Sequence, residues 1–379
     1  ARHVGDAMRS YRYFQMPGID MLANRYEYTT AKQAASVVRQ MDKAGMASEL
    51  YGVTNWNFDF RGHKLQGDWQ AALGVTLRVP HLSWMYMGGE SKRDYPAPID
   101  AHSPWHGRYS LIEDYFGRIN MALTRGKARV EVCVIHPIES MFMLLGPDKD
   151  TLWERNRLEE EFQELAGWLL FGQMDFDFLS EALIPKLYKG TEKKRLLIGE
   201  MSYRAVVIPP LLTIRSTTLQ MLEEFSKKGG MVITMGRLPG CVDGNGLPNG
   251  IAVDIHSKNI GFDRHALMKE LEECRMLRIL DGKGLQRKDL LYQLREEEGC
   301  KWLFIAQGHD NRKRDGGISA KGKVEGQIRI EIAGGYDVCL WNAMKGMRES
   351  AVYEIRNVCC KTGGCRMETH VWVPFWEHD

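Results

Sequence analysis

The chain has 379 residues, which at about 150 residues per domain predicts two or three domains. Its 51 Lys and Arg residues nearly balance its 49 Asp and Glu residues, leaving a formal charge of +2, so no basic stripe is available for a nucleic-acid backbone. Hydrophobic residues make up 44% of the chain and charged residues 26%, a globular composition that excludes a disordered, collagen-like or coiled-coil protein.

Cysteine content and hydropathy indicate the cellular compartment in which the protein is expected. The eight cysteines are dilute and form no paired framework, which favours free thiols and a cytoplasmic location. No apolar run approaches the ~18 residues that a membrane span requires, so we expect no membrane association. The sequence begins at Ala1 without an initiator Met or a signal-peptide pattern, and we expect the natural N-terminus to lie upstream.

Strand-like and helix-like stretches alternate through the first third of the chain. The predicted elements are helix 31–41, strand 46–50, helix 64–73, strand 75–79 and helix 109–123. Strand ends that carry polar groups, each followed by a helix, are typical of the top face of a (β/α)₈ barrel. Because a whole barrel needs about 250 residues, we interpret residues 1–127 as the C-terminal part of one.

The pattern changes near residue 130. Residues 128–284 predict a parallel, doubly wound α/β domain. Its elements are strand 130–135, helix 150–170, strand 205–208, helix 217–228, strand 231–234 and helix 263–277. Beyond this domain, every second residue tends to be apolar, which is the period of a β-strand. Residues 285–379 are therefore predicted to form a small antiparallel β-sandwich, which we interpret as incomplete. Its strands are 302–306, 327–332, 336–341, 351–355 and 367–372.

Glu49 is the sharpest candidate for a catalytic residue. It closes the apolar strand 46–50 and is followed by Tyr51 and a glycine. A carboxylate at the carboxyl end of a barrel strand is well placed to face a substrate. Most glutamates lie on the surface without a catalytic role, so the assignment depends on the surroundings. Asp20, in a turn near another strand end, is a second candidate acid.

Ring-bearing side chains are concentrated in the stretch that follows Glu49. Apolar sugar faces pack on such rings, while sugar hydroxyls bond to neighbouring His, Arg and Asp side chains. Rings in a polar, Pro-rich loop cannot all belong to a core, so this stretch predicts a sugar-binding surface. The candidates for substrate binding are Asp20, Tyr51, Trp56, Asp68, Trp69, His81, Trp84, Arg93 and Trp105.

Four motifs carry a resemblance to a known class of enzyme. They are SELYG at 48–52, HKLQGDWQAALGV at 63–75, PHLSW at 80–84 and SPW at 103–105. They resemble the last barrel strands of large multidomain glycoside hydrolases, namely the family 42 β-galactosidases and the family 106 α-L-rhamnosidases. The latter have a D-W-x-x-x-x-G-V segment after a catalytic Glu. The domain order is also similar, because in family 42 the barrel is followed by an amidotransferase-like α/β domain, which residues 203–233 resemble, and then by a β-sandwich.

The resemblance implies a role for Glu49. It corresponds to the catalytic carboxylate at the end of barrel strand seven, the nucleophile of a retaining enzyme or the general base of an inverting one. In the relatives the general acid lies on strand four, so here it is expected upstream of Ala1. The implied activity is exo-acting hydrolysis of a terminal sugar such as a galactoside or rhamnoside, with no cofactor. The sugar and the stereochemical outcome stay open.

Other kinds of site are disfavoured by the sequence. An amidotransferase needs a Gly-flanked Cys directly after a strand, and Cys241 follows its strand only after several residues. Gly244, Gly246 and Gly250 are not in dinucleotide-binding register. We therefore expect the α/β domain to support the barrel or to build a homo-oligomer interface. Cys359, Cys360, Cys365 and His370 are awkwardly spaced for zinc, so no metal site is predicted.

Two classes of function remain. The first is an exo-acting glycoside hydrolase with a carbohydrate substrate. The second is a non-catalytic carbohydrate-binding or scaffold protein on a degenerate or incomplete barrel. Glu49 discriminates between them, because only the first needs its carboxylate.

Overall fold

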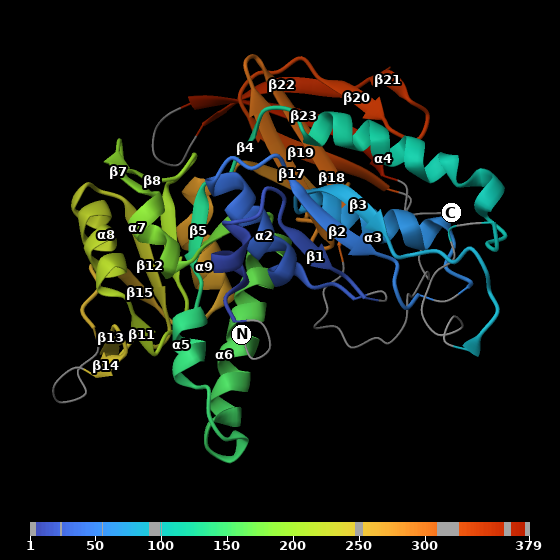
Figure 1. Ribbon diagram of the computed structural model, residues 1–379. Helices are drawn as coiled ribbons and strands as arrows, with labels where there is room; N and C mark the ends of the chain where they lie inside the picture. Colours follow the sequence, from blue (N-terminus) through green and yellow to red (C-terminus); the bar gives the residue numbers. More distant parts are fainter. Residues whose placement is uncertain are drawn as a thin grey trace.

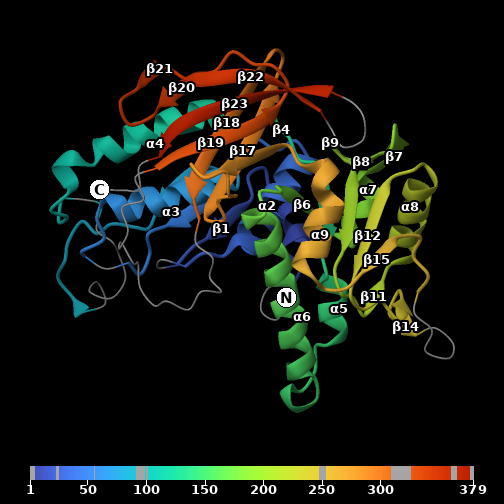
Figure 2. The same cartoon turned by 180° about the vertical axis from the view of Figure 1, so that it is seen from behind.

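The computed structural model describes residues 5–22, 25–54, 56–90, 99, 101–246, 253–308, 326–359 and 365–375. Three groups of sheets pack against one another (Figure 1). A small parallel sheet near the N-terminus lies beside a larger parallel sheet, and the antiparallel strands lie above the small sheet, as the view from behind also shows (Figure 2). Within the described residues, no helix is long and apolar enough to cross a membrane.

The first parallel sheet has the strand order β1-β2-β3, and each strand leads to a helix. Its elements are β1 (Gly18–Asp20), α2 (Tyr28–Gln40), β2 (Met46–Leu50), α3 (Phe60–Ala72), β3 (Val75–Pro80) and α4 (Ser110–Leu123), preceded by α1 (Ala7–Tyr11). The predicted strands and helices of this region are confirmed to within a few residues. Asp59 begins α3, because its carboxylate accepts the backbone N–H groups of Arg61 and Gly62.

The two faces of this sheet differ in burial. On the face towards the helices, Ser48 is fully buried and donates to Gln70 Oε1 at 2.5 Å, and Met46 joins the main core. Side chains alternate along a strand, so the opposite face carries the residues between these. On that face Leu77 is 47% and Val79 42% exposed. The sheet therefore leaves an apolar face uncovered.

The second parallel sheet has the order β15-β12-β10-β5-β6, with every pairing parallel. In chain order this is the 2-1-3-4-5 arrangement of doubly wound sheets. Its strands are β5 (Val132–Ile135), β6 (Phe176–Leu179), β10 (Ala205–Ile208), β12 (Met231–Met235) and β15 (Lys258–Ile260). Its helices are α5 (Ile138–Met143), α6 (Asp148–Phe171), α7 (Ile184–Leu187), α8 (Ser216–Lys227) and α9 (Arg264–Glu270).

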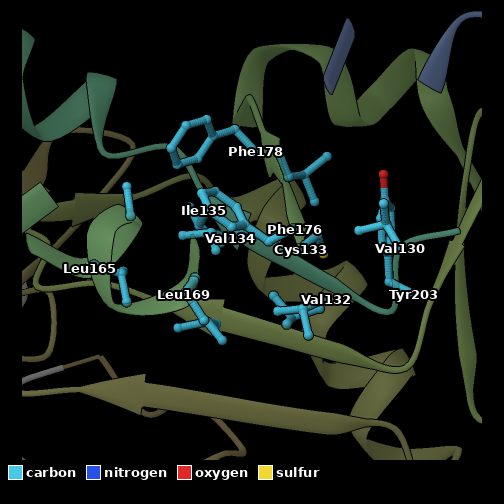
Figure 3. Packing of buried hydrophobic residues seen from close by; sticks show 14 of the residues in the cluster. Val130, Val132, Cys133, Val134, Ile135, Leu165, Leu169, Phe176, Phe178 and Tyr203 are labelled. Carbon is cyan, nitrogen blue, oxygen red and sulfur yellow. The ribbon is translucent and has the colours of Figure 1, made fainter. Parts of the chain in front are cut away.

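The centre of this sheet is apolar on both sides. All four residues of β5, β6 and β10 are buried, as parallel strands covered on both faces require. Figure 3 shows Val132 and Val134 of β5 packed among Phe176 of β6 and Leu169 of α6. Two small sheets flank it: β7 (Tyr188–Glu192), β8 (Arg195–Ile198) and β9 (Met201–Tyr203), and β11 (Thr213–Ile214), β13 (Cys241–Val242) and β14 (Asn245–Gly246).

The predicted helix 263–277 is wrong in its second half. The helix α9 ends at Glu270, a 3-10 turn covers Leu271–Cys274, and β16 (Leu277–Leu280) follows. The physical reason is the change of period, because Leu277 and Ile279 are buried on either side of the partly exposed Arg278. That alternation suits a strand rather than another helical turn.

The antiparallel strands form two sheets with a common core. One sheet has the order β16-β19-β23-β22 and the other β18-β17-β4. Leu277 and Ile330 of the first pack with Leu290 and Leu294 of the second. The strands not yet given are β4 (Lys127–Ala128), β17 (Leu290–Glu297), β18 (Cys300–Gln307), β19 (Gly326–Ala333), β22 (Val352–Cys359) and β23 (Cys365–Phe375), with a separate hairpin of β20 (Cys339–Asn342) and β21 (Met347–Ser350). The boundaries at 127 and 284 stay predictions, but β16 belongs to the same sheet as β19.

A buried group of charges joins the two parallel sheets. Lys32 and Arg39 of α2 meet Asp175 and Asp177 at β6, with Lys32 Nζ 2.7 Å from Asp175 Oδ1 and Arg39 NH1 2.9 Å from Asp177 Oδ1. Tyr203 donates to Asp177 Oδ2 at 2.9 Å. Two cations balance two anions, so the group is neutral and fixes α2 against the larger sheet.

Candidate active site

Glu49 stands on the uncovered face of the first sheet, near its carboxyl end. In the strand register Glu49 lies between Asp20 of β1 and Val79 of β3. Its side chain is 49% exposed, and Asp20 is also exposed. The structure thus brings the two predicted acids side by side at one edge, as expected for the carboxyl ends of parallel strands.

His81 reaches the same place from the next strand. Its Nε2 lies 4.0 Å from Glu49 Oε1, and its backbone N–H donates to the carbonyl of Leu50 at 2.7 Å. The second contact extends the pairing of β2 with β3 by one residue, so the position of His81 follows from the sheet. A Cβ on Gly52 would come within 2.7 Å of His81 Cδ2, which shows how closely the chain after Glu49 approaches the ring.

The turn after Glu49 is conformationally unusual. Tyr51 has φ 73° and Val53 has φ 60°, a left-handed conformation that costs about 1–3 kcal/mol in non-glycine residues. The turn carries the Tyr51 side chain into the interior, where it is only 1% exposed. Tyr51 is therefore placed to hold the turn rather than to contact a sugar.

Arg78 donates a hydrogen bond to the Tyr51 hydroxyl on the helix-covered face of the sheet. Its NH1 donates to Tyr51 Oη at 3.0 Å and its NH2 donates to Glu113 Oε2 at 2.7 Å. Burial raises the pKa of Tyr51 to about 12, so the phenol stays protonated and donates onward to the carbonyl of His63 at 3.3 Å. Sequence reasoning missed Arg78, although the alternation of Leu77, Arg78 and Val79 would have placed it on the opposite face from its neighbours.

Two other predicted site residues lie in the core. Trp69 is fully buried and its Nε1 donates to Gln66 at 3.0 Å. Asp68 is 5% exposed and accepts the Tyr115 hydroxyl at 2.8 Å. Both belong to α3, and Asp68 links this helix to α4, while Trp69 packs edge-to-face on Tyr28 of α2 with ring centroids 5.3 Å apart.

The remaining aromatic candidates lie in loops. Trp56 is 38% exposed, and Trp84 and Trp105 are partly buried. Trp105 lies near Phe60, with ring centroids 6.4 Å apart. Arg93 falls outside the described residues. Within the described part of the chain, no three His, Cys, Asp or Glu side chains group as a metal site.

No protein-family model and no curated protein matches the sequence significantly. Solved structures do match. A rhamnosidase from Novosphingobium sp. PP1Y is 13% identical with a TM-score of 0.68, and the match covers 99% of this chain and 36% of that one. A catalytic variant of a GH42 β-galactosidase from G. stearothermophilus is 12% identical with a TM-score of 0.55, covering 98% and 61%. A GH42 exo-carrageenase from Bacteroides ovatus is 10% identical with a TM-score of 0.51, covering 97% and 49%.

These likenesses concern the fold. Nearly the whole chain is similar to part of each enzyme, and the chain spans about a third of the rhamnosidase and three fifths of the β-galactosidase. The expected resemblance to rhamnosidases and family 42 β-galactosidases is therefore confirmed at the level of the fold. The chain has a glycosidase-like fold.

Proposed function

We propose that the chain is the C-terminal part of an exo-acting glycoside hydrolase that removes a terminal sugar such as a galactoside or rhamnoside. In this proposal residues 1–127 contribute the last strands of a catalytic (β/α)₈ barrel, followed by an amidotransferase-like domain and a β-sandwich. Glu49 is the nucleophile or the general base. The likeness in fold to three glycosidases supports the architecture.

The observation that carries the proposal is the uncovered sheet face around Glu49. Leu77 and Val79 are 47% and 42% exposed on it, whereas the helix-covered face is packed. Side chains that point into a barrel alternate with those that face its helices. The uncovered face thus has the properties of an inner barrel wall, with Glu49 and Asp20 at the carboxyl-terminal rim where barrel enzymes bind substrates.

Glycosidic cleavage needs a second carboxyl group. It lies about 5 Å from the first for retention and about 6.5–9.5 Å away for inversion. We assign the general acid to barrel strands outside these 379 residues. Asp20 is assigned to sugar hydroxyls, because it is the cross-strand neighbour of Glu49 on the same side of the sheet.

His81 and the loop aromatics complete the proposed site. His81 Nε2 lies 4.0 Å from the carboxylate of Glu49, and we assign it to orienting that carboxylate. Trp56, Trp84, Arg93 and Trp105 supply stacking surfaces and hydrogen bonds to the sugar. Carboxyl groups alone catalyse glycosidic cleavage in this mechanism, so it needs no cofactor. We further propose a cytoplasmic enzyme that self-associates through the α/β domain.

A substrate screen tests the proposal. The natural polypeptide that contains this chain is incubated with nitrophenyl glycosides of galactose, rhamnose and fucose, and nitrophenol release is measured. We expect turnover of one of these sugars and its loss in the Glu49→Gln variant. Glu224→Gln on α8, an exposed residue paired with Lys228, serves as the matched control and should retain full activity.

The alternative is a non-catalytic carbohydrate-binding or scaffold protein. The strained turn at Tyr51 and Val53 would then serve only the fold. This alternative predicts sugar binding without turnover of any glycoside, and equal behaviour of the wild type and Glu49→Gln. Turnover that persists unchanged in Glu49→Gln would refute the assignment of Glu49.

A further inference from the structure

A cavity of about 600 Å³ lies away from the Glu49 face, against the larger parallel sheet. It is lined by Arg9, Ser10, Arg12, Tyr13, Phe14, Ala182 and Arg215. Ala182 lies just beyond the carboxyl end of β6 in that sheet, and Arg215 follows β11 of the small flanking sheet. Ligands of open α/β sheets bind at the carboxyl ends of their strands, and the volume falls within the roughly 300–1,000 Å³ of small-molecule sites.

Two of the three lining arginines are neutralised by the protein itself. Arg9 Nε lies 3.0 Å from Asp6 Oδ2, and Arg9 also pairs with Glu139. Arg215 NH2 lies 2.8 Å from the same Glu139 oxygen. These pairs fix both guanidinium groups in the wall of the cavity.

Arg12 is different. Among the described residues no carboxylate pairs with it, and its buried Nε has no hydrogen-bond partner there. Its guanidinium carbon lies 4.3 Å from the centroid of the Tyr13 ring, and its NH2 donates to the Tyr13 hydroxyl. The cavity therefore contains one cation, held in place by an aromatic ring, whose charge the described protein groups leave uncompensated.

Two exposed aromatic side chains are among the lining residues of the cavity. Tyr13 is 70% and Phe14 52% exposed, although both are large enough to be expected in a core. A guanidinium fork binds a carboxylate or sulfate through two parallel hydrogen bonds, and a flat exposed ring packs against the apolar face of a sugar. The two features stand side by side in one cavity.

We propose that this cavity is a second saccharide site, which binds an acidic sugar residue with its carboxylate or sulfate group on Arg12 and its ring against Phe14. The saccharide part of the inference rests on the proposed function, whereas the anion part does not. The site would hold a charged chain or product away from Glu49, so it does not depend on the catalytic assignment.

Calorimetric titration of the natural polypeptide tests the inference. The probes are D-galacturonic acid, D-galactose 6-sulfate, neutral D-galactose and sodium sulfate. We expect both acidic sugars to bind, and Arg12→Ala to weaken each about tenfold or more, since a charge-assisted fork is lost. Phe14→Ala, which keeps the cation, should weaken the acidic sugars but not sulfate. Arg278→Ala, at an arginine paired with Glu272, is the control and should bind like the wild type.

The outcomes separate this site from the active site. Acidic sugars that bind to the wild type but more weakly to Arg12→Ala support a second site, even if no glycoside is ever hydrolysed, because Arg12 is no part of the proposed active site. Equal binding by Arg12→Ala and the wild type, with the fold intact by circular dichroism, overturns the inference. Sulfate that binds as tightly as galactose 6-sulfate overturns the saccharide part, and absence of binding by every probe overturns all of it.

Discussion

His81 Nε2 lies 4.0 Å from Glu49 Oε1, although the two residues belong to different strands. The contact exists because the hydrogen bond from His81 N to Leu50 O extends the β2–β3 ladder by one residue. Gly52 leaves the space that the imidazole occupies. The local backbone thus positions an imidazole ring beside the candidate catalytic carboxylate.

Replacing Gly52 should disturb this contact. In Gly52→Ala the new methyl group would lie 2.7 Å from His81 Cδ2, so the ring must move. We expect kcat/KM to fall about tenfold to a hundredfold, as for misplaced catalytic groups, with little change in unfolding free energy. His81→Ala should cause a similar loss, and the double variant should be no worse than either single one. Strictly additive losses would show that Gly52 acts elsewhere.

The uncovered sheet face should be buried in the natural polypeptide. Leu77 is 47% exposed in this chain, so Leu77→Lys should change its unfolding free energy by no more than about 0.5 kcal/mol. In the natural polypeptide the same substitution places a charge inside a barrel and should cost about 2–5 kcal/mol. Urea unfolding of both proteins measures the difference. Equal effects in the two would contradict the inner-wall interpretation.

Removing one of the buried charges between α2 and β6 should destabilise the protein. Lys32 is fully buried and contacts both Asp175 and Asp177. Removing one partner of a buried ion pair typically costs about 3–5 kcal/mol, so Lys32→Ala should destabilise the protein by that order in urea unfolding. Lys227→Ala, in an exposed pair with Glu223, should have little effect. A small loss in Lys32→Ala would mean that water or another cation compensates the aspartates.

Glu181 should make stability depend on pH. Burial raises its pKa from 4.5 to about 7, while Arg215 N donates to its Oε2 at 2.8 Å and Glu139 adds repulsion. A folded pKa above the unfolded value means that the stabilisation is complete below about pH 4.5 and is lost as the pH rises through 7. The free energy of unfolding of Glu181→Gln should therefore exceed that of the wild type by up to about 3 kcal/mol at pH 8, and the two should be equal at pH 4.5. The same gain at both pH values would exclude ionisation as the cause.

The local pattern of apolar and polar residues was sufficient to predict many of the helices and strands. The strands at Met46–Leu50 and Ala205–Ile208 match the prediction, because short apolar runs bounded by polar residues or prolines leave few alternatives. The helix before Leu277 was predicted too long. A strand follows it almost directly, and at such a junction the same apolar residues fit both the helical and the strand period. The strand Leu290–Glu297 was missed, because its last residues are charged although its first five are buried.

The candidate site was only partly predictable. Glu49 and His81 were recognisable because each ends an apolar strand, and strand ends of parallel sheets converge. Tyr51 and Trp69 were expected to contact sugar, but both side chains are buried. Tyr51 turns inwards at a positive φ of 73°, which an aromatic residue rarely adopts and which no pattern of residue types reveals.

The central claim is that Glu49 is a catalytic carboxylate, and kcat of Glu49→Gln tests it most directly. It should be measured in the natural polypeptide on the best aryl glycoside, alongside Glu224→Gln, with the sugar affinity of each determined by calorimetry. We predict that kcat falls about 10³-fold or more in Glu49→Gln, while sugar affinity changes little and Glu224→Gln matches the wild type. A kcat for Glu49→Gln within a few fold of the wild type would contradict it.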